Sequence, residues 1–366
     1  MDNFVVSARK YRPKGFEEVV GQGHITTTLT NAIVNKQLAQ AMLFCGPRGV
    51  GKTTCARIVA RMINDFDESE QNSLNIFELD GASNNSVDDI RNLIDQIRYP
   101  PQYGTHKVYI IDEVHMLSNQ AFNAFLKTLE EPPDYAIFIL ATTEKHKVIP
   151  TILSRCQIFD FNRIQISDIA DHLKNIALAE GITTEEEALH LIAQKADGAL
   201  RDALSIFDLL VTFSSNKHIT YQSAINNLHV LDYDYYFRLT DYLLKKDVAN
   251  ALLLFDEVLQ KGFDGHNFLV GLNSHFRDLM VSKNAATIKL MEVPDSAKKK
   301  YLEQSSITSS SFLLSAMNIT LQGDINYKSS KNQRLLVELT LAKLAHVEDV
   351  INLAKALDEG GDKKKS

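Results

Sequence analysis

One stretch decides the fold of the amino-terminal half of this chain: Gly46-Pro47-Arg48-Gly49-Val50-Gly51-Lys52-Thr53. The apolar run Ala41 to Cys45 comes directly before it, and a helical pattern of apolar residues follows it. The form G-x-x-x-x-G-K-[ST] between a strand and a helix is typical of a P-loop, whose backbone N–H groups cradle phosphates. A glycine-rich turn with an incidental lysine is the alternative, and the flanking strand and helix favour the P-loop.

The loop predicts a site for ATP and Mg²⁺. The N-terminus of the following helix adds roughly half a positive charge at the phosphates. We expect Lys52 to reach the β- and γ-phosphates and the Thr53 hydroxyl to bind magnesium. The residues expected to contact the nucleotide are Gly46, Pro47, Arg48, Gly49, Val50, Gly51, Lys52, Thr53 and Thr54.

A second motif follows a buried strand, in the run Val108-Tyr109-Ile110-Ile111-Asp112-Glu113. A parallel sheet exposes its functional groups at the carboxyl ends of its strands, so both carboxylates are expected at the site. We expect Asp112 to hold the magnesium and Glu113 to orient or deprotonate the attacking water. A surface acidic pair is the alternative, and the position of the pair behind a P-loop argues against it.

The first half of the chain alternates short apolar runs with helical patterns. Near-continuous apolar character predicts strands that are buried on both faces of a parallel sheet. Between two of these strands, Ser118 is expected to cap a helix that ends before Pro132. This βαβ series predicts an α/β domain. The five expected strands are Ala41 to Cys45, Ile76 to Asp80, Val108 to Asp112, Ala136 to Thr142 and Ile158 to Phe161.

From about Ser167 onward the strand signal disappears and helical patterns dominate. Ser167 is expected to cap one helix, and Thr184 with Glu187 has the spacing of a capping box for the next. Further stripes of apolar residues at helical spacing continue beyond the polar stretch 214–217. We therefore expect a small helical domain followed by a larger, all-helical one.

Composition excludes several classes of protein. The chain has 366 residues, 45% of them hydrophobic, a formal net charge of −7 and three widely spaced cysteines. No apolar run is long enough to span a membrane, and the first residues lack the pattern of a secretion signal. The cysteines, Cys45, Cys55 and Cys156, cannot form a disulfide framework or a four-cysteine zinc site. We therefore expect a cytoplasmic protein.

The order of these motifs resembles the clamp-loader ATPases of the AAA+ type, and in particular the gamma/tau family of bacterial DNA polymerase III. The most specific match is the run 111–117 taken together with the run 126–133. The matching segments span roughly residues 8–210: 8–13, 19–22, 46–54, 109–118, 125–133, 140–143, 151–156 and 198–204.

The resemblance assigns roles to residues that spacing alone would leave as ordinary surface positions. It implies that Thr143 senses the γ-phosphate and that Arg201 is a second sensor, which reaches from the lid domain to ATP in its own subunit. It implies that Arg155 is an arginine finger for ATP bound by the neighbouring subunit; such fingers are worth about 10³–10⁵ in rate. Near the base and ribose it places Tyr11, Arg12 and Val20.

The resemblance also implies a domain plan. Residues 1–163 form the AAA+ nucleotide-binding domain, 164–216 the helical lid, and 217–358 a helical collar through which subunits oligomerise. Residues 359–366 form a polar tail. Relatives usually carry a four-cysteine zinc module after the P-loop helix, whereas the stretch from Asn64 to Asn75 here has no cysteine. No zinc is therefore expected.

The implied function is that of an ATP-driven motor subunit without polymerase chemistry of its own. Expected partners are delta and delta-prime subunits, the sliding clamp, the polymerase holoenzyme and primer–template DNA, with no membrane. DNA would be recognised independently of sequence, through phosphates and duplex shape. The segment 82–86 matches the start of the DNA-facing helix, although Asn84 and Asn85 stand where some relatives have basic residues.

Two other functions fit parts of the sequence. A Holliday-junction branch-migration motor would share the nucleotide site but would not bind a clamp. A scaffold subunit of the delta-prime type would have a decayed site, which the presence of Lys52, Thr53, Asp112 and Glu113 argues against.

Overall fold

The chain divides into two compact units, Met1–Ile219 (unit 1) and Thr220–Ser366 (unit 2). The structure is a computed structural model, and it describes residues 5–64, 75–102, 104–214, 216–228, 231–291, 293 and 295–349. The expected polar tail, 359–366, lies outside these ranges, as does most of the stretch for which no zinc was expected. No helix in the described ranges is long and apolar enough to cross a membrane.

Unit 1 contains a five-stranded parallel sheet with the strand order β2-β3-β4-β1-β5. Strands β1, β2 and β4 have the predicted bounds, while β3 begins one residue earlier and β5 is shifted back by one residue. The strands are β1 (Ala41–Cys45), β2 (Ile76–Asp80), β3 (Lys107–Asp112), β4 (Ala136–Thr142) and β5 (Gln157–Asp160).

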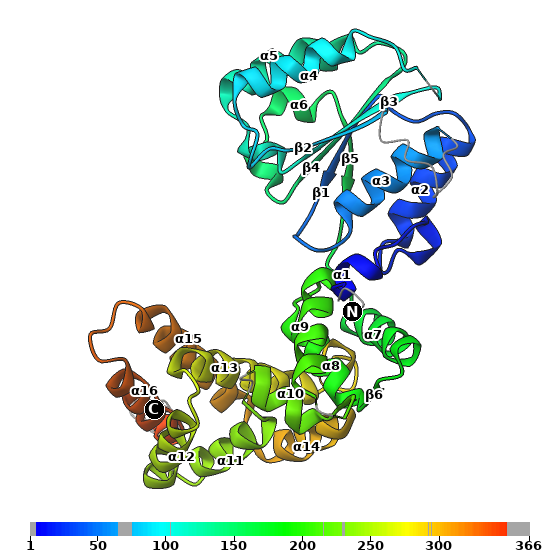
Figure 1. Ribbon diagram of the computed structural model, residues 1–366. Coiled ribbons are helices and arrows are strands. Elements are labelled where there is room, and N and C mark those ends of the chain that lie inside the picture. The colour runs from blue at the N-terminus through cyan, green and yellow to red at the C-terminus, as the bar shows by residue number, and fades with distance from the viewer. Residues whose placement is uncertain are drawn as a thin grey trace. The chain divides into compact units, whose positions relative to one another are not determined.

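Helices cover both faces of this sheet and make a three-layer arrangement (Figure 1). Side chains alternate along β1: Leu43 joins the core beneath α4, α5 and α6, whereas Met42 joins the core beneath α2 and α3. The helices are α2 (Gly23–Val34), α3 (Lys52–Ile63), α4 (Val87–Ile97), α5 (Asn119–Glu130) and α6 (Pro150–Leu153). Ser118 caps α5, as predicted, by accepting a hydrogen bond from the backbone N–H of Ala121.

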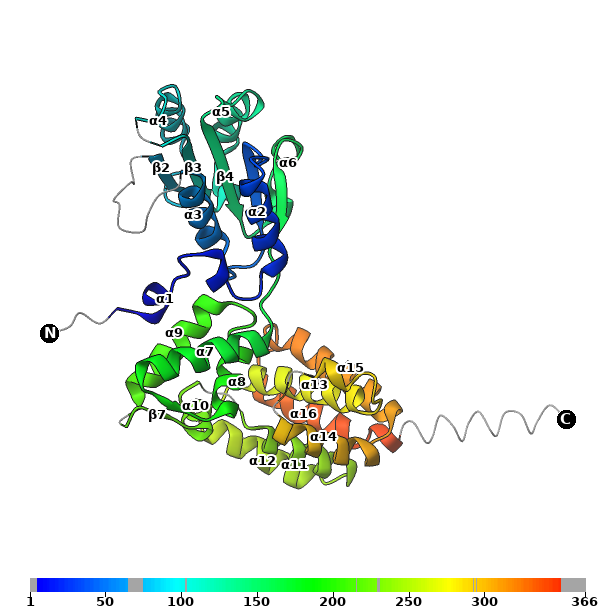
Figure 2. The same cartoon turned by 90° about the vertical axis from the view of Figure 1, so that its right-hand side faces the viewer.

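Three further helices of unit 1 pack against one another after the sheet (Figure 2). They are α7 (Ile166–Glu180), α8 (Glu186–Lys195) and α9 (Leu200–Phe213). Short α1 (Ser7–Lys10), from the start of the chain, packs on α9, where the Ser7 N–H donates to Asp208 at 2.7 Å. The predicted small helical domain is therefore present.

Three predictions about this region were wrong. Ser167 lies inside α7, whose N-cap is Gln165. Thr184 does not cap α8, which has Glu185 as its N-cap, because Thr184 pairs instead with a distant segment of chain. That pairing forms two short parallel strands, β6 (Thr183–Thr184) and β7 (His218–Ile219), where no strand was expected.

In its described residues unit 2 consists of helices around one apolar core. Helix α13 is central and packs on α14 and α15. The α-helices are α10 (Tyr221–Leu228), α11 (Tyr233–Leu244), α12 (Val248–Gln260), α13 (Gly265–Ser282), α14 (Asp295–Ile307), α15 (Ser310–Tyr327) and α16 (Gln333–Ala345).

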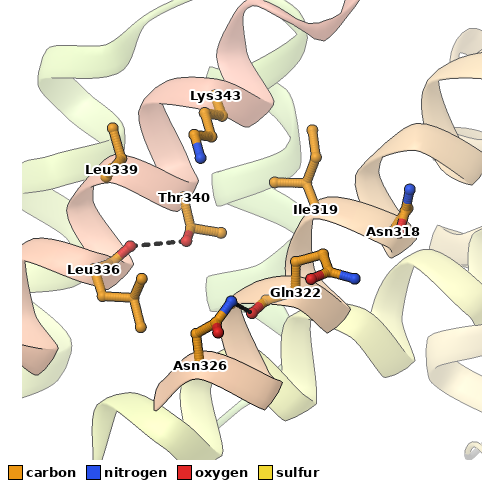
Figure 3. A pocket seen from close by; sticks show the side chains of 9 residues that line it. Asn318, Ile319, Gln322, Asn326, Leu336, Leu339, Thr340 and Lys343 are labelled. Atoms are coloured by element: carbon orange, nitrogen blue, oxygen red, sulfur yellow. Dashed lines mark hydrogen bonds between the residues drawn. The ribbon is translucent and has the colours of Figure 1, made fainter. Parts of the chain in front are cut away.

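A shallow groove lies between α15 and α16 (Figure 3). The helices approach closely here, because a Cβ on Gly323 would stand 3.1 Å from the Thr340 hydroxyl. Beside the groove, Leu314, Leu321 and Ile325 lie exposed along α15 at the spacing of one helical face. Unit 2 thus carries an apolar stripe on its surface.

Candidate active site

The carboxyl ends of the central strands bring the predicted motifs to one edge of the sheet. Cys45 is paired with Thr142 across β1 and β4, and Asp80 is paired with Asp112 across β2 and β3. The backbone continues this order beyond the strands, since the N–H of Gly46 donates to the carbonyl of Thr142 at 3.2 Å. The P-loop, Asp112 and the end of β4 are therefore neighbours.

Glycine is required at two turns of the P-loop. Gly46 has φ of 147°, and a Cβ there would stand 2.4 Å from the carbonyl oxygen of Phe161. Gly51 has φ of 105° at the N-cap of α3, a left-handed conformation that only glycine adopts readily. These two positions turn the loop around the N-terminus of α3, where backbone N–H groups favour anions.

Lys52 is buried although it carries an ammonium group. The side chain is 6% exposed, and Nζ donates to the carbonyls of Gly46 at 2.8 Å and Pro47 at 2.7 Å. Burial lowers the pKa of Lys52, while the carboxylates of Glu113 and Asp112 oppose that shift. The loop thus holds a cation directly beneath the turn that would cradle phosphates.

Thr53 and Asp112 meet at the expected metal position. The Thr53 hydroxyl donates to Oδ2 of Asp112 at 2.6 Å, and the N–H of Glu113 donates to Oδ1 at 2.9 Å. A hydroxyl and a carboxylate side by side are the oxygen donors that Mg²⁺ prefers. The donor set therefore fits magnesium, with room in the adjoining cleft for the other ligands.

Glu113 is turned toward the end of β4 by a left-handed backbone, with φ of 45°. Its carboxylate oxygen Oε2 accepts hydrogen bonds from the Thr143 N–H at 3.1 Å and the Thr143 hydroxyl at 2.9 Å. A non-glycine residue with positive φ is uncommon and concentrates at functional positions. The geometry links the predicted base to the predicted γ-phosphate sensor.

His115 completes this network and was not predicted. Its Nδ1 lies 2.9 Å from the Thr142 hydroxyl and 3.4 Å from the Glu113 carboxylate, while Nε2 lies 3.2 Å from the Glu144 carboxylate. The imidazole side chain is only 7% exposed. Nothing in the spacing of the sequence identifies it, because its partner on β4, Thr142, lies 27 residues away along the chain.

These groups border a cleft of about 600 Å³. Most of the predicted site residues line it; Thr143 instead reaches the site through Glu113, and the carbonyls of Gly46 and Pro47 hold Lys52. The predicted residues in the lining are Tyr11, Arg12, Val20, Arg48, Gly49, Val50, Gly51, Lys52, Thr53, Thr54, Asp112, Glu113 and Arg201.

One wall of the cleft is cationic. Burial lowers the pKa of Arg12, and the nearby guanidinium groups of Arg57 and Arg201 add to that effect. Arg57 lines the cleft but was not predicted. It follows Thr53 by four residues on α3, so helical spacing alone could have placed the two on one face. Its guanidinium forms a two-pronged pair with Glu78, with both N···O distances 2.6 Å.

Another part of the cleft lining is apolar and comes partly from the lid helices. It includes Val20 and three residues that sequence reasoning missed, namely Ile164, Leu200 and Leu204. The Tyr11 hydroxyl donates to Glu180 at the end of α7. Apolar walls with a few polar groups are typical of the part of a pocket that holds a ring system.

Arg201 stands where the lid helices meet the P-loop. Its backbone N–H donates to the carbonyl of Gly49 at 3.4 Å, and a Cβ on Gly49 would lie 3.0 Å from that of Ala199. Arg201 thus lines the same cleft as Lys52 although the two are far apart in the sequence.

Arg155 lies elsewhere: among the described residues, those that line the cleft do not include it. It follows α6, and its guanidinium pairs with Glu130 at the end of α5. Nη1 also donates to the Thr151 carbonyl at 2.6 Å and the Ser154 hydroxyl at 3.2 Å. The structure therefore separates Arg155 from the site in its own subunit.

The three cysteines are free in the structure. Burial raises the pKa of Cys45 and Cys156 to about 11 and that of Cys55 to about 12. Thiols this weakly acidic are poor nucleophiles near neutral pH. Among the described residues no cluster of three or more histidine, cysteine or acidic side chains could hold a metal.

Three family models match consecutive parts of the chain. Residues 21–165 match the DNA polymerase III delta subunit, and residues 168–216 match the ATPase lid domain of the DNA polymerase III clamp-loader subunit. Residues 224–359 match domain III of the DNA polymerase III subunits gamma and tau.

Curated relatives match over most of the chain. The DNA polymerase III subunit tau of Bacillus subtilis is 39% identical over 351 residues, which cover 92% of this chain and 62% of that protein. The DNA polymerase III subunit gamma of Buchnera aphidicola subsp. Baizongia pistaciae is 34% identical over 359 residues, which cover 93% of this chain and 97% of that protein. The chain thus spans less than two thirds of the tau protein but nearly all of the gamma protein.

Among solved structures, the Thermotoga maritima RuvB Holliday junction branch migration motor has a similar fold. It has a TM-score of 0.50 and 21% identity, and the match covers 64% of this chain and 79% of that one. The predicted fold class is confirmed: a P-loop parallel-sheet domain of the AAA+ type, a helical lid and a helical third domain. The chain belongs to the gamma/tau family of DNA polymerase III clamp-loader subunits.

Proposed function

We propose that this chain is an ATP-hydrolysing motor subunit of a clamp loader, and that it has no polymerase chemistry of its own. The observation that carries the proposal is the convergence of Lys52, Thr53, Asp112 and Glu113 on one cleft, with Arg155 outside it. A cleft that holds these groups but not the proposed finger, Arg155, suits an enzyme whose active site is completed across a subunit boundary.

In this proposal the loop residues from Gly46 to Thr54 bind the phosphates of ATP. Lys52 leaves the carbonyls of Gly46 and Pro47 and donates instead to the β- and γ-phosphate oxygens, which are better acceptors because they are charged. Tyr11, Arg12 and Val20 border the base and ribose, beside the apolar wall from the lid.

Thr53 and Asp112 would hold magnesium, which neutralises charge on the β- and γ-phosphates when it is bound. Glu113 orients the attacking water and takes its proton at Oε2. That oxygen now accepts both bonds from Thr143, so Thr143 is in a position to report the γ-phosphate to the base. Arg201 completes the contacts from the lid side of the cleft.

The chain is also expected to assemble with other subunits and to act on DNA. We propose that 1–163, 164–216 and 217–358 act as nucleotide-binding, lid and collar domains, and that the collar oligomerises with delta and delta-prime subunits. The apolar stripe on α15 supports a collar that meets other chains. The assembly would open the sliding clamp and place it on primer–template DNA within the polymerase holoenzyme, in the cytoplasm.

Contact with DNA is proposed at the start of α4. Ser86 caps this helix with a full capping box, and the carbonyl of Asn85 accepts from the N–H of Ser118, which caps α5. A helix N-terminus can bind a DNA phosphate without reading sequence.

The test is Arg155→Ala in the complex assembled with partner subunits, clamp and primed DNA. We expect nucleotide binding to persist and DNA-stimulated turnover to fall by about 10³-fold or more, because the finger stabilises transition-state charge. Full turnover in this variant would show that Arg155 is not a finger for ATP bound by the neighbouring subunit. Clamp binding by the wild-type complex separates this function from branch migration, since a branch-migration motor moves DNA junctions and ignores the clamp.

A further inference from the structure

The proposed finger, Arg155, is held by a specific partner on its own subunit. Its guanidinium donates through Nη2 to the carboxylate of Glu130, the last residue of α5. The pair joins two segments separated by 25 residues, and neither side chain is fully exposed, at 32% for Arg155 and 47% for Glu130. Glu130 has no place in the cleft described above.

Both ends of this pair are fixed by the core. Leu129, next to Glu130, and Ile152, at the end of α6 before Arg155, are 4% and 0% exposed and belong to the same apolar cluster. The backbone at both ends is therefore fixed, and the ion pair sets the direction of the arginine side chain. A pair between rigid elements loses less side-chain entropy than one between mobile chains.

The position of Glu130 is not explained by the stability of α5. The carboxyl end of a helix carries partial negative charge, which disfavours an acidic side chain there. Arg155 is the cation that offsets this repulsion. Glu130 is unfavourable for the end of α5 but forms a specific pair with Arg155. Its role therefore concerns Arg155 rather than the stability of the helix.

The contacts leave part of the guanidinium for an outside acceptor. An arginine has five N–H donors, and the bonds to Glu130, Thr151 and Ser154 use only the two terminal nitrogens. Among the described residues, Nε has no partner within hydrogen-bond distance. Such an arginine is oriented and still able to donate to phosphate oxygens.

We propose that Glu130 is a positioning residue for Arg155: it orients the guanidinium toward the nucleotide bound by the neighbouring subunit. This inference rests on the proposed function, in which Arg155 acts across the subunit boundary. Glu130 acts on the rate of the neighbour's reaction and has no effect on nucleotide binding in its own cleft.

The test uses Glu130→Ala in the fully assembled complex with clamp and primed DNA. We expect kcat for ATP to fall by up to about 10²-fold, as for a misplaced catalytic group, with KM unchanged. The matched control is Glu131→Ala, which removes an exposed carboxylate of the same charge from the next position and should retain wild-type kcat. Nucleotide affinity and thermal unfolding of the isolated Glu130→Ala chain should equal those of the wild type.

A second arm separates positioning from loss of structure. In an Arg155→Ala background, Glu130→Ala should change turnover no further, because its effect passes only through the arginine. A further loss in that background would overturn the proposal, as would equal turnover in the Glu130→Ala and Glu131→Ala complexes. A rise in turnover would also overturn it, since it would mean that Glu130 restrains the finger. Full activity of Arg155→Ala alone would instead refute the proposed function.

Discussion

Buried polar side chains serve different ends in the two units. In unit 1, buried Lys52 lines the cleft, and the buried Thr142 hydroxyl lies 2.9 Å from His115, which lies 3.4 Å from Glu113 in the cleft lining. In unit 2, His275 is 1% exposed, and its ring nitrogens lie 3.0 Å from the Tyr301 hydroxyl and 3.2 Å from Gln304 Oε1, inside the core. The polar groups named in unit 1 belong to the candidate active site, whereas those named in unit 2 form hydrogen bonds with one another inside the core.

The largest effect is expected from Lys52→Ala. The variant should lose phosphate binding and lower turnover by about 10³-fold or more, because it removes the P-loop cation expected at the β- and γ-phosphates. Its thermal stability should be retained, since the ammonium's hydrogen-bond partners among the described residues are carbonyls of its own loop. Calorimetric titration with ATP measures the loss of binding, and a turnover assay measures the loss of activity. Lys174→Ala, at an exposed lysine of α7, is the control; equal ATP affinity in both variants would contradict the assignment.

Glu113→Gln should have the next largest effect and a different signature. The amide cannot accept the proton from water, so turnover should fall about 10²–10⁴-fold while ATP affinity stays near wild type. Comparing the ATP affinity and single-turnover hydrolysis of this variant with those of Lys52→Ala separates chemistry from binding. Loss of ATP binding in Glu113→Gln would show that Glu113 is structural.

In unit 2 the effect should appear in stability and depend on pH. Burial lowers the pKa of His275 to about 3, so the folded chain keeps it neutral where the unfolded chain binds a proton. Stability should therefore fall as pH falls from about 6.5 toward 3, by about 2 kcal/mol between pH 7 and pH 5. Urea unfolding across this pH range measures the loss.

The variant His275→Gln removes the ionisable group and should remove that part of the pH dependence. His346→Gln, at an exposed histidine, is the control and should retain it. An unchanged pH profile in His275→Gln would mean that the buried imidazole does not titrate as described.

Sequence reasoning succeeded where local pattern determines structure. The strands β1, β2 and β4 were predicted to the residue, because β1 and β4 are buried apolar runs and β2 has Ile76, Phe77 and Leu79 in a short segment. The P-loop residues, Asp112 and Glu113 follow from spacing, since a parallel sheet gathers its strand ends at one edge. Arg57 was missed although its spacing from Thr53 was sufficient to find it.

Sequence reasoning failed where segments far apart in the chain determine the local structure or the partner of a side chain. Thr184 pairs with Ile219 in a short strand, so its capping potential is not used. Ser167 was a reasonable cap by residue type, but α7 begins at Ile166, one residue earlier. His115 and Glu130 gain their partners only when separate elements pack together.

One measurement decides whether the neighbouring subunit completes the active site of this chain. ATP hydrolysis is measured for the wild-type and Arg155→Ala chains, each assembled with partner subunits, with and without clamp and primed DNA. We predict stimulation by clamp and DNA in the wild type and its loss in the variant, with ATP affinity unchanged. Equal stimulation in the two complexes would contradict it.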